Sequence, residues 1–323
     1  MNPKVWQGRI DQEDASQGRR IHQQVTPLPK NGNLDGTPVL LGFATDEGVR
    51  RNQGRPGAVA GPNAIRQGLA NQSCTEEFKL YDKGDIALEN HQLELGQALH
   101  GDQVSQLLER KGFVVTLGGG HEIGWSSFLG AQNFLSGQNS SLGIINFDAH
   151  FDLRNPDPIA SSGTPFRQCA EYCQEHNLPF NYCVFGLNPT ANTTPLFDYA
   201  KSKEVLWLED QYCHLGRLQQ AFDMVDQFLQ RVDYLYITLC MDVFNQAYAP
   251  GVSAPASIGV SPHWMLEVLN YIAERSQSEN RPILLMDVAE VNPEFDQENQ
   301  TGKLAARIIR QVIDTRAVAE SNS

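Results

Sequence analysis

The sequence predicts an α/β protein with three layers, in which a mostly parallel β-sheet carries helices on both faces. Short apolar segments alternate with amphipathic segments along most of the chain, which is typical of repeated βα units. The apolar segments are continuous runs, as expected for strands that are buried on both faces. No change of composition marks a second domain in the 323 residues. We therefore expect an irregular arm at 1–37, one domain at 38–316 and a tail at 317–323.

The elements are assigned from the period of their apolar residues and from turn residues at their ends. Pro62, for example, suits the first turn of a helix. Strands are expected at 38–43, 78–87, 113–121 with a glycine turn at its end, 141–150, 180–187, 204–208, 232–242 and 282–291. Helices are expected at 61–70, 93–112, 122–135, 214–231, 261–275 and 301–315, with a further helix that begins close to residue 167.

Composition and charge exclude several classes of partner. The formal net charge of −13 disfavours nucleic acid and anionic membranes as partners. An anionic small molecule would need local arginines. The polar N-terminus and the lack of a long apolar run predict a cytoplasmic protein, and six cysteines without zinc-finger spacing suit a reducing compartment. Cys169 and Cys173 have helical spacing, so they are either packing residues or a metal-binding pair.

Metal-ligand side chains stand at the carboxyl ends of four of the predicted strands. They are His121 and Glu122 at the end of the third strand, Asp148, His150 and Asp152 at the end of the fourth, Asp242 at the end of the seventh, and Glu290 at the end of the eighth. In open α/β sheets, ligands bind beyond the carboxyl ends of the strands. We therefore expect these side chains to meet at one edge of the sheet.

The segment DAHFD has a spacing that matters for its chemistry. In an extended chain, residues i, i+2 and i+4 lie on the same side, so Asp148, His150 and Asp152 can converge on one centre. Carboxylate and imidazole ligands with little sulfur suit Mn(II), Zn(II) or Fe(II). The alternative is that the two aspartates cap a loop or helix and the histidine is a satisfied core residue. The other polar strand ends favour the metal site.

Several motifs together resemble the ureohydrolases, the family that includes arginase, agmatinase and formimidoylglutamase. The motifs are GGGHE (118–122), NFDAHFDLR (146–154), SSGTPF (161–166), MDVF…APGVSAP (241–255), DVAEVNP (287–293) and the glycine-rich RNQGRPGAVAGPNAIR (51–66). The resemblance extends over about residues 38 to 316 and implies the arginase-like fold. It also implies a homo-oligomer.

The resemblance implies two Mn(II) ions bridged by hydroxide, which attacks an amidine or guanidine carbon. His121, Asp148, Asp152 and position 240 would hold one ion, while Asp148, His150, position 240 and Asp242 would hold the other. Position 240 departs from the family pattern, because a bridging aspartate is expected there and this chain has Cys240. A thiolate ligand would shift the preference toward Zn or Fe. The alternative is an ordinary buried cysteine beside one weakly held ion.

The resemblance also assigns the substrate contacts. Glu290 corresponds to the family carboxylate that faces the amidinium through two parallel hydrogen bonds; the alternative is a strand-end salt bridge. Arg154 stands where arginase-type members have a neutral residue, and Arg167 follows nearby. Both would bind a substrate carboxylate, unless they form salt bridges on the surface. Ser162 replaces the histidine of agmatinase-type members.

These features are most similar to formimidoylglutamase, which converts N-formimidoyl-L-glutamate to L-glutamate and formamide in histidine degradation. Asp148, Asp242 and Glu290 would then be the catalytic residues, with Asp242 or a metal-bound water as candidate proton donor to the leaving amine. One alternative is another ureohydrolase, such as a guanidinobutyrase or an agmatinase-type enzyme. Another is a non-catalytic member of the family with an impaired metal site.

Overall fold

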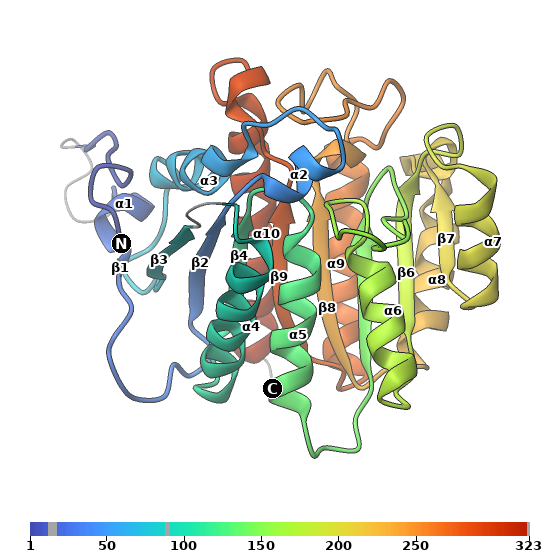
Figure 1. The fold of residues 1–323 in the computed structure, drawn as a ribbon. Helices are drawn as coiled ribbons and strands as arrows, with labels where there is room; N and C mark the ends of the chain where they lie inside the picture. The colour runs from blue at the N-terminus through green and yellow to red at the C-terminus, as the bar shows by residue number, and fades with distance from the viewer. Residues whose placement is uncertain (12–17, 88–90, 322–323) are drawn as a thin grey trace.

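A computed structural model describes residues 1–11, 18–87 and 91–321 (Figure 1). Its centre is a sheet with the strand order β1-β3-β2-β4-β9-β8-β5-β6-β7, in which all neighbours run parallel. The strands are β1 (Thr26–Pro27), β2 (Pro38–Ala44), β3 (Tyr81–Ala87), β4 (Phe113–Gly118), β5 (Leu142–Phe147), β6 (Asn181–Leu187), β7 (Leu206–Glu209), β8 (Tyr234–Cys240) and β9 (Ile283–Ala289). Their carboxyl ends therefore share one edge.

Helices cover both faces of the sheet. The helices are α1 (Ile21–Gln24), α2 (Glu47–Arg51), α3 (Gly61–Ala70), α4 (Leu93–Glu109), α5 (Ile123–Leu135), α6 (Pro165–Glu175), α7 (Thr194–Ser202), α8 (Leu218–Leu229), α9 (Pro262–Ser278) and α10 (Gln300–Ser321). In Figure 1, α4, α5 and α6 lie in front of the sheet, and α9 and α10 lie behind it. Buried residues of α3 and α8 pack in the same cluster as those of α9 and α10. The predicted three-layer α/β fold is confirmed.

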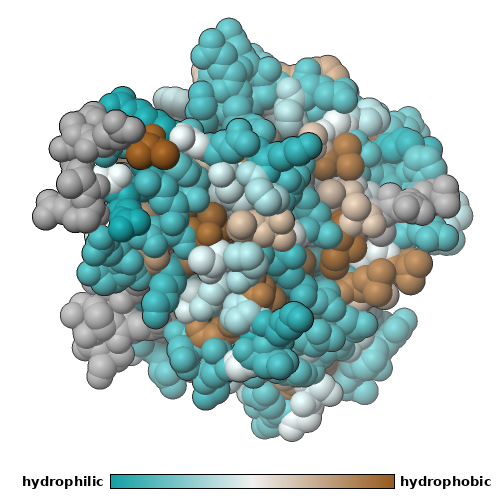
Figure 2. All heavy atoms as spheres, turned by 90° about the vertical axis from the view of Figure 1, so that its left-hand side faces the viewer, coloured by the Kyte–Doolittle hydropathy of each residue, from teal (hydrophilic) through white to brown (hydrophobic). Residues whose placement is uncertain are grey.

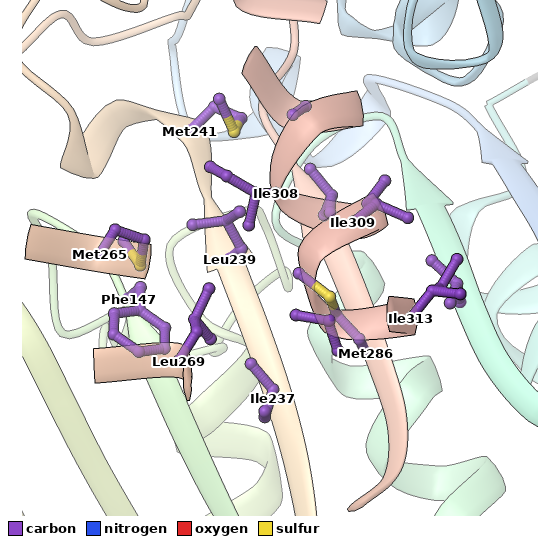
Figure 3. Packing of buried hydrophobic residues seen from close by; sticks show 14 of the residues in the cluster. Phe147, Ile237, Leu239, Met241, Met265, Leu269, Met286, Ile308, Ile309 and Ile313 are labelled. Atoms are coloured by element: carbon purple, nitrogen blue, oxygen red, sulfur yellow. The ribbon is translucent and has the colours of Figure 1, made fainter. Parts of the chain in front are cut away.

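The core has two large parts, one on each side of the sheet. Behind the sheet, Leu239 of β8 and Met286 of β9 pack with Ile308 and Ile309 of α10 and Leu269 of α9 (Figure 3). These side chains are at most 4% exposed. Burying each stabilises the fold by about 1.5–3 kcal/mol. The continuous apolar strands are therefore buried on both faces, as their sequence indicates.

The N-terminal segment differs from the expected irregular arm. It contains α1 and β1, and β1 pairs with β3 at the edge of the sheet. The indole of Trp6 is buried and donates a hydrogen bond to Asp82 at 2.7 Å. The surface on this side is mostly hydrophilic with separate small apolar groups (Figure 2). At the other terminus, α10 continues to Ser321, beyond the predicted helix end at 315.

The turn after β4 needs glycine because the backbone that follows β2 lies against it. A Cβ atom at Gly119 would stand 1.5 Å from the carbonyl oxygen of Thr45. His121 lies just after this turn, between the end of β4 and the start of α5.

In the described part of the chain, no helix is long and apolar enough to cross a membrane.

Candidate metal centre and active site

Four neighbouring strands, β4, β9, β8 and β5, deliver the predicted side chains to one cavity of about 320 Å³. His121 follows β4, His150 and Asp152 follow β5, Asp242 follows β8, and Glu290 follows β9. All five line this cavity, and Asp148 lies beneath it in contact with both histidines. The structure therefore brings these six predicted side chains together. Glu122, which was expected with them, does not line the cavity but is buried and accepts the backbone N–H of Gly48 at 2.8 Å.

The first group of possible metal ligands is His121, Asp148 and Cys240. One donor atom from each lies within 4.8 Å of the others. Nδ1 of His121 is 2.9 Å from Oδ2 of Asp148 and also 2.9 Å from Oδ2 of Asp152. A cation at this point would be surrounded by one nitrogen, one sulfur and two carboxylates.

The second group is Asp148, His150 and Asp242, whose donor atoms also lie within 4.8 Å of one another. Nδ1 of His150 is 3.2 Å from Oδ2 of Asp242 and 3.5 Å from Oδ1 of Asp148. Asp148 thus belongs to both groups, as a bridging ligand would. Its Oδ1 also accepts the backbone N–H of His150 at 2.8 Å, so the aspartate shapes its own loop as well.

The buried carboxylates of Asp148, Asp152 and Asp242 lie close together, and positive charge would stabilise them. Burial opposes ionisation of Asp148, but hydrogen bonds from His121 and His150 outweigh it and hold its pKa below the usual range. Burial and the charge of Asp148 raise the pKa of Asp152 to about 6, and the same two causes raise the pKa of Asp242. Within the described residues, only the two histidines form ion pairs with these carboxylates.

A divalent cation fits this donor set. Oδ1 of Asp242 and Oε2 of Glu290 are buried and have no hydrogen-bond partner in the described structure. Buried carboxylates that remain ionised need a paired charge or a bound metal. Oxygen and imidazole donors match Mn(II), Zn(II) and Fe(II). Two ions held by the two groups would compensate the crowded carboxylates.

Cys240 lies where a metal ligand is expected, but its thiol is protonated in the protein alone, whereas a ligand must be a thiolate. Its side chain is buried, and burial, followed by the nearby Asp148 and Asp242, raises the pKa of the thiol well above its usual value. The protein alone therefore favours the neutral thiol. Only a bound cation would favour the thiolate, so Cys240 would become a ligand only together with the ion that it binds.

Glu290 faces the cavity from a strained backbone position. Its φ of 68° is in the left-handed region, which is uncommon for residues other than glycine. The backbone N–H of Glu290 donates to the carbonyl of Gly119 at 2.8 Å, and its Oε1 accepts the N–H of His121 at 3.0 Å. Among the described residues it forms no salt bridge, so the alternative role for this residue is not realised.

Of the two predicted anion-binding arginines, only Arg154 lies at the site. Arg154 is exposed and lines the cavity, and no partner for its guanidinium is recorded in the described structure. Arg167 does not line the cavity. Its Nε donates to Glu171 at 2.7 Å, and its guanidinium stacks 3.6 Å above the ring of Tyr199. The structure thus does not bring Arg167 to this cavity, because α6 directs the side chain toward its own next turn and α7.

Other cavity residues were not singled out from the sequence. They are Asn52, Gln53, Gly54, Arg55, Ala191, Asn192, Leu196, Ser253 and Ala254, whereas Ser162 was noted only as a family difference. The loop 52–55 belongs to the glycine-rich motif, so a signal was present. Arg55 fastens this loop by donating to the carbonyls of Ser253 at 2.8 Å and Val252 at 2.6 Å. The side chain of Asn192 accepts the N–H of Phe151 at 3.0 Å and supports the DAHFD loop.

Cys169 and Cys173 lie on the buried side of α6 and are both free thiols. Burial raises the pKa of Cys173 to about 12, and it also raises that of Cys169. Neither belongs to a group of possible metal ligands among the described residues. The packing interpretation is therefore the one that the structure supports.

Comparison with known proteins agrees with this geometry. The model of the arginase family matches residues 37–314. The chain belongs to the arginase family. This confirms the resemblance to the ureohydrolases that the motifs of the sequence indicate.

Within the arginase family, this chain is similar over nearly its whole length to formimidoylglutamases. It is 42% identical to that of Ralstonia nicotianae, with 97% of this chain and 95% of the relative covered. It is 41% identical to that of Rhodococcus jostii, with 97% and 96% covered. The crystal structure of formimidoylglutamase from Bacillus subtilis has the same fold, with a TM-score of 0.81 at 21% identity over 96% of this chain and 94% of the other. Trypanosoma cruzi formiminoglutamase, whose structure contains Mn²⁺, has a TM-score of 0.74 at 24% identity, covering 88% and 94%.

Proposed function

We propose that this protein hydrolyses N-formimidoyl-L-glutamate to L-glutamate and formamide, a step of histidine degradation. The observation that carries the proposal is one cavity lined both by the carboxylates of the metal centre and by the exposed Arg154. The substrate has an amidine at one end and two carboxylates at the other, so it matches both. The similarity to formimidoylglutamases over nearly the whole chain supports the same choice.

His121, Asp148, His150, Asp152, Cys240 and Asp242 would hold two Mn(II) ions, which, when bound, lower the pKa of water and supply the nucleophile. Glu290 orients the amidinium, because its free Oε2 is buried at the cavity while Oε1 is held by His121. Arg154 binds a carboxylate of the glutamate part with a charge-assisted hydrogen bond. Asp242 has one unpartnered oxygen beside the reaction centre and is the candidate to carry a proton to the leaving amine.

The resident ion, the compartment and the assembly are part of the proposal. Mn(II) is supported by the oxygen-rich donor set and by the ion in the Trypanosoma cruzi structure. A cytoplasmic location is supported by six free, buried cysteines, which suit a reducing compartment. A homo-oligomer remains a prediction from the family resemblance.

Formamide release from N-formimidoyl-L-glutamate by the Mn(II)-loaded protein tests the proposal. We expect turnover with this substrate and little with agmatine, arginine or 4-guanidinobutyrate, since these lack the second carboxylate. Urea release from a guanidine compound, without activity on formimidoylglutamate, would overturn the substrate assignment in favour of another ureohydrolase. Metal content close to zero and no turnover after Mn(II) loading would favour a non-catalytic member of the family.

A further inference from the structure

Four polar side chains form a row across the centre of the sheet, just below the metal centre. The row consists of Thr116 on β4, Asp287 on β9, Thr238 on β8 and Asn146 on β5, which are register partners in that order. All four are 0% exposed. Central parallel strands are normally apolar, and burying polar groups is costly without compensation. This polar row crosses the same four strands that end at the metal centre. Its side chains are therefore placed to support the metal ligands.

Two members of the polar row contact predicted metal ligands directly. Nδ2 of Asn146 donates to Oδ2 of Asp148 at 3.1 Å. Oγ1 of Thr238 is 2.9 Å from Nε2 of His121. Because Nδ1 of His121 faces Asp148 and Asp152, its Nε2 is the nitrogen turned away from the centre. A hydrogen on Nε2 that is donated to Thr238 leaves the lone pair of Nδ1 free for a cation.

Asp287 is the next residue in line behind Thr238. A threonine hydroxyl has one hydrogen to donate. If its oxygen accepts from His121, that hydrogen is available for the carboxylate of Asp287, its register partner. Oδ2 of Asp287 accepts from the hydroxyl of Tyr236, and the hydroxyls of Thr238 and Ser127 are further hydrogen-bond partners of this carboxylate. In this arrangement the hydrogens point in one direction, from His121 to Thr238 and from Thr238 to Asp287.

We propose that Asp287 is a positioning residue of the metal centre, which acts through Thr238 to hold the His121 ring with Nδ1 toward the cations. It touches neither substrate nor reacting atoms. Partners of this kind fix the tautomer and orientation of a ligating histidine, and their loss weakens metal binding by about 10- to 100-fold. The proposal rests on the metal site of the proposed function.

Mn(II) affinity, measured by competition with a chelator on the purified full-length protein, tests the role of Asp287. We expect Thr238→Val to weaken Mn(II) binding by about 10- to 100-fold, because it removes the hydroxyl at nearly constant shape. Thr238→Ser keeps the hydroxyl, so its Mn(II) affinity should equal that of the unmodified protein. Asp287→Asn also weakens binding, but the double variant Asp287→Asn with Thr238→Val binds no more weakly than Thr238→Val alone, since Asp287 acts through Thr238.

Thr116→Val is the matched control, because Thr116 lies in the same row beside Asp287 while its hydroxyl meets Ser127 at 3.3 Å and no metal ligand. Its Mn(II) affinity stays unchanged. Any one of three results would overturn the inference. Folded Thr238→Val could bind Mn(II) as tightly as the unmodified protein, or Thr116→Val could lose as much Mn(II) affinity as Thr238→Val. The third is that the losses of Asp287→Asn and Thr238→Val add up in the double variant. If Thr238→Val does not fold, Asp287→Asn is compared with Thr116→Val, and equal affinities overturn it. If the unmodified protein does not bind Mn(II) at all, the result contradicts the proposed function and not only the role of Asp287.

Discussion

Arg154 and Arg167 belong to the same connection between β5 and β6, yet their surroundings differ completely. Arg154 is exposed at the cavity without a recorded partner, whereas Arg167 is held by Glu171 and Tyr199. The sequence offers two arginines close to the metal motif, Arg154 within the motif and Arg167 at the start of a predicted helix, and it assigns both to anion binding. Which one reaches the cavity depends on the direction in which each side chain leaves the backbone, and that is set by the docking of α6.

The difference between the two arginines gives a prediction for substrate binding. Arg154→Ala removes a charge-assisted contact of about 1.5–3 kcal/mol and should raise KM roughly tenfold or more, with a smaller effect on kcat. Arg167→Ala is the control and should leave both constants unchanged. Steady-state kinetics with N-formimidoyl-L-glutamate provide the measurement. An unchanged KM in Arg154→Ala would remove this residue from the substrate site.

At the scale of elements, α4 carries a buried histidine that the metal centre does not use. The ring of His100 is fully buried, and its centroid lies 5.0 Å from that of the Phe43 ring on β2 in a tilted arrangement. Neither ring nitrogen has a hydrogen-bond partner in the described structure. Burial lowers its pKa to about 3. The ring is therefore neutral at physiological pH, and its protonation opposes the packing of α4 on the sheet.

Acid should therefore weaken the fold through His100. Its pKa is about 3 in the folded chain and about 6.5 when unfolded, so between these values the unfolded state binds more protons. Above pH 6.5, the protonation of His100 does not reduce the free energy of unfolding. Below pH 6.5, this group lowers the free energy of unfolding by up to about 1.4 kcal/mol per pH unit. In His100→Phe, this pH-dependent loss is absent. Urea unfolding of both proteins from pH 7 to pH 5 measures it, and parallel curves would contradict the prediction.

The sequence predicts the long elements well because their period and their caps are local properties. It misses α2 and α7, which span only Glu47–Arg51 and Thr194–Ser202, since short helices owe their stability to tertiary packing. The polar row also escapes detection. Thr238 and Asp287 are single polar residues inside apolar strands, and only the strand order makes them neighbours. Metal ligands are easier to find, because they stand at strand ends where the chain turns polar.

For the whole molecule, the metal centre joins β4, β5 and β8, which lie far apart in the sequence. A ligand that binds only the folded chain stabilises it by mass action, by about 2.7 kcal/mol at a free concentration one hundred times Kd. Removal of Mn(II) with a chelator should therefore lower Tm, and added Mn(II) should restore it. In Asp242→Ala the chelator should have a smaller effect. A Tm that does not respond to Mn(II) would contradict the centre proposed here.

The strand order also determines how the chain must assemble during synthesis. The strands made first form two separate groups, β1-β3-β2-β4 and β5-β6-β7, and only β8 and β9 join them in the middle. Until residues 234–289 have left the ribosome, the inner borders of both groups remain unpaired. Such open borders invite pairing with other chains. A nascent polypeptide of this topology is therefore most exposed to aggregation, and most in need of a chaperone, just before its last two strands emerge.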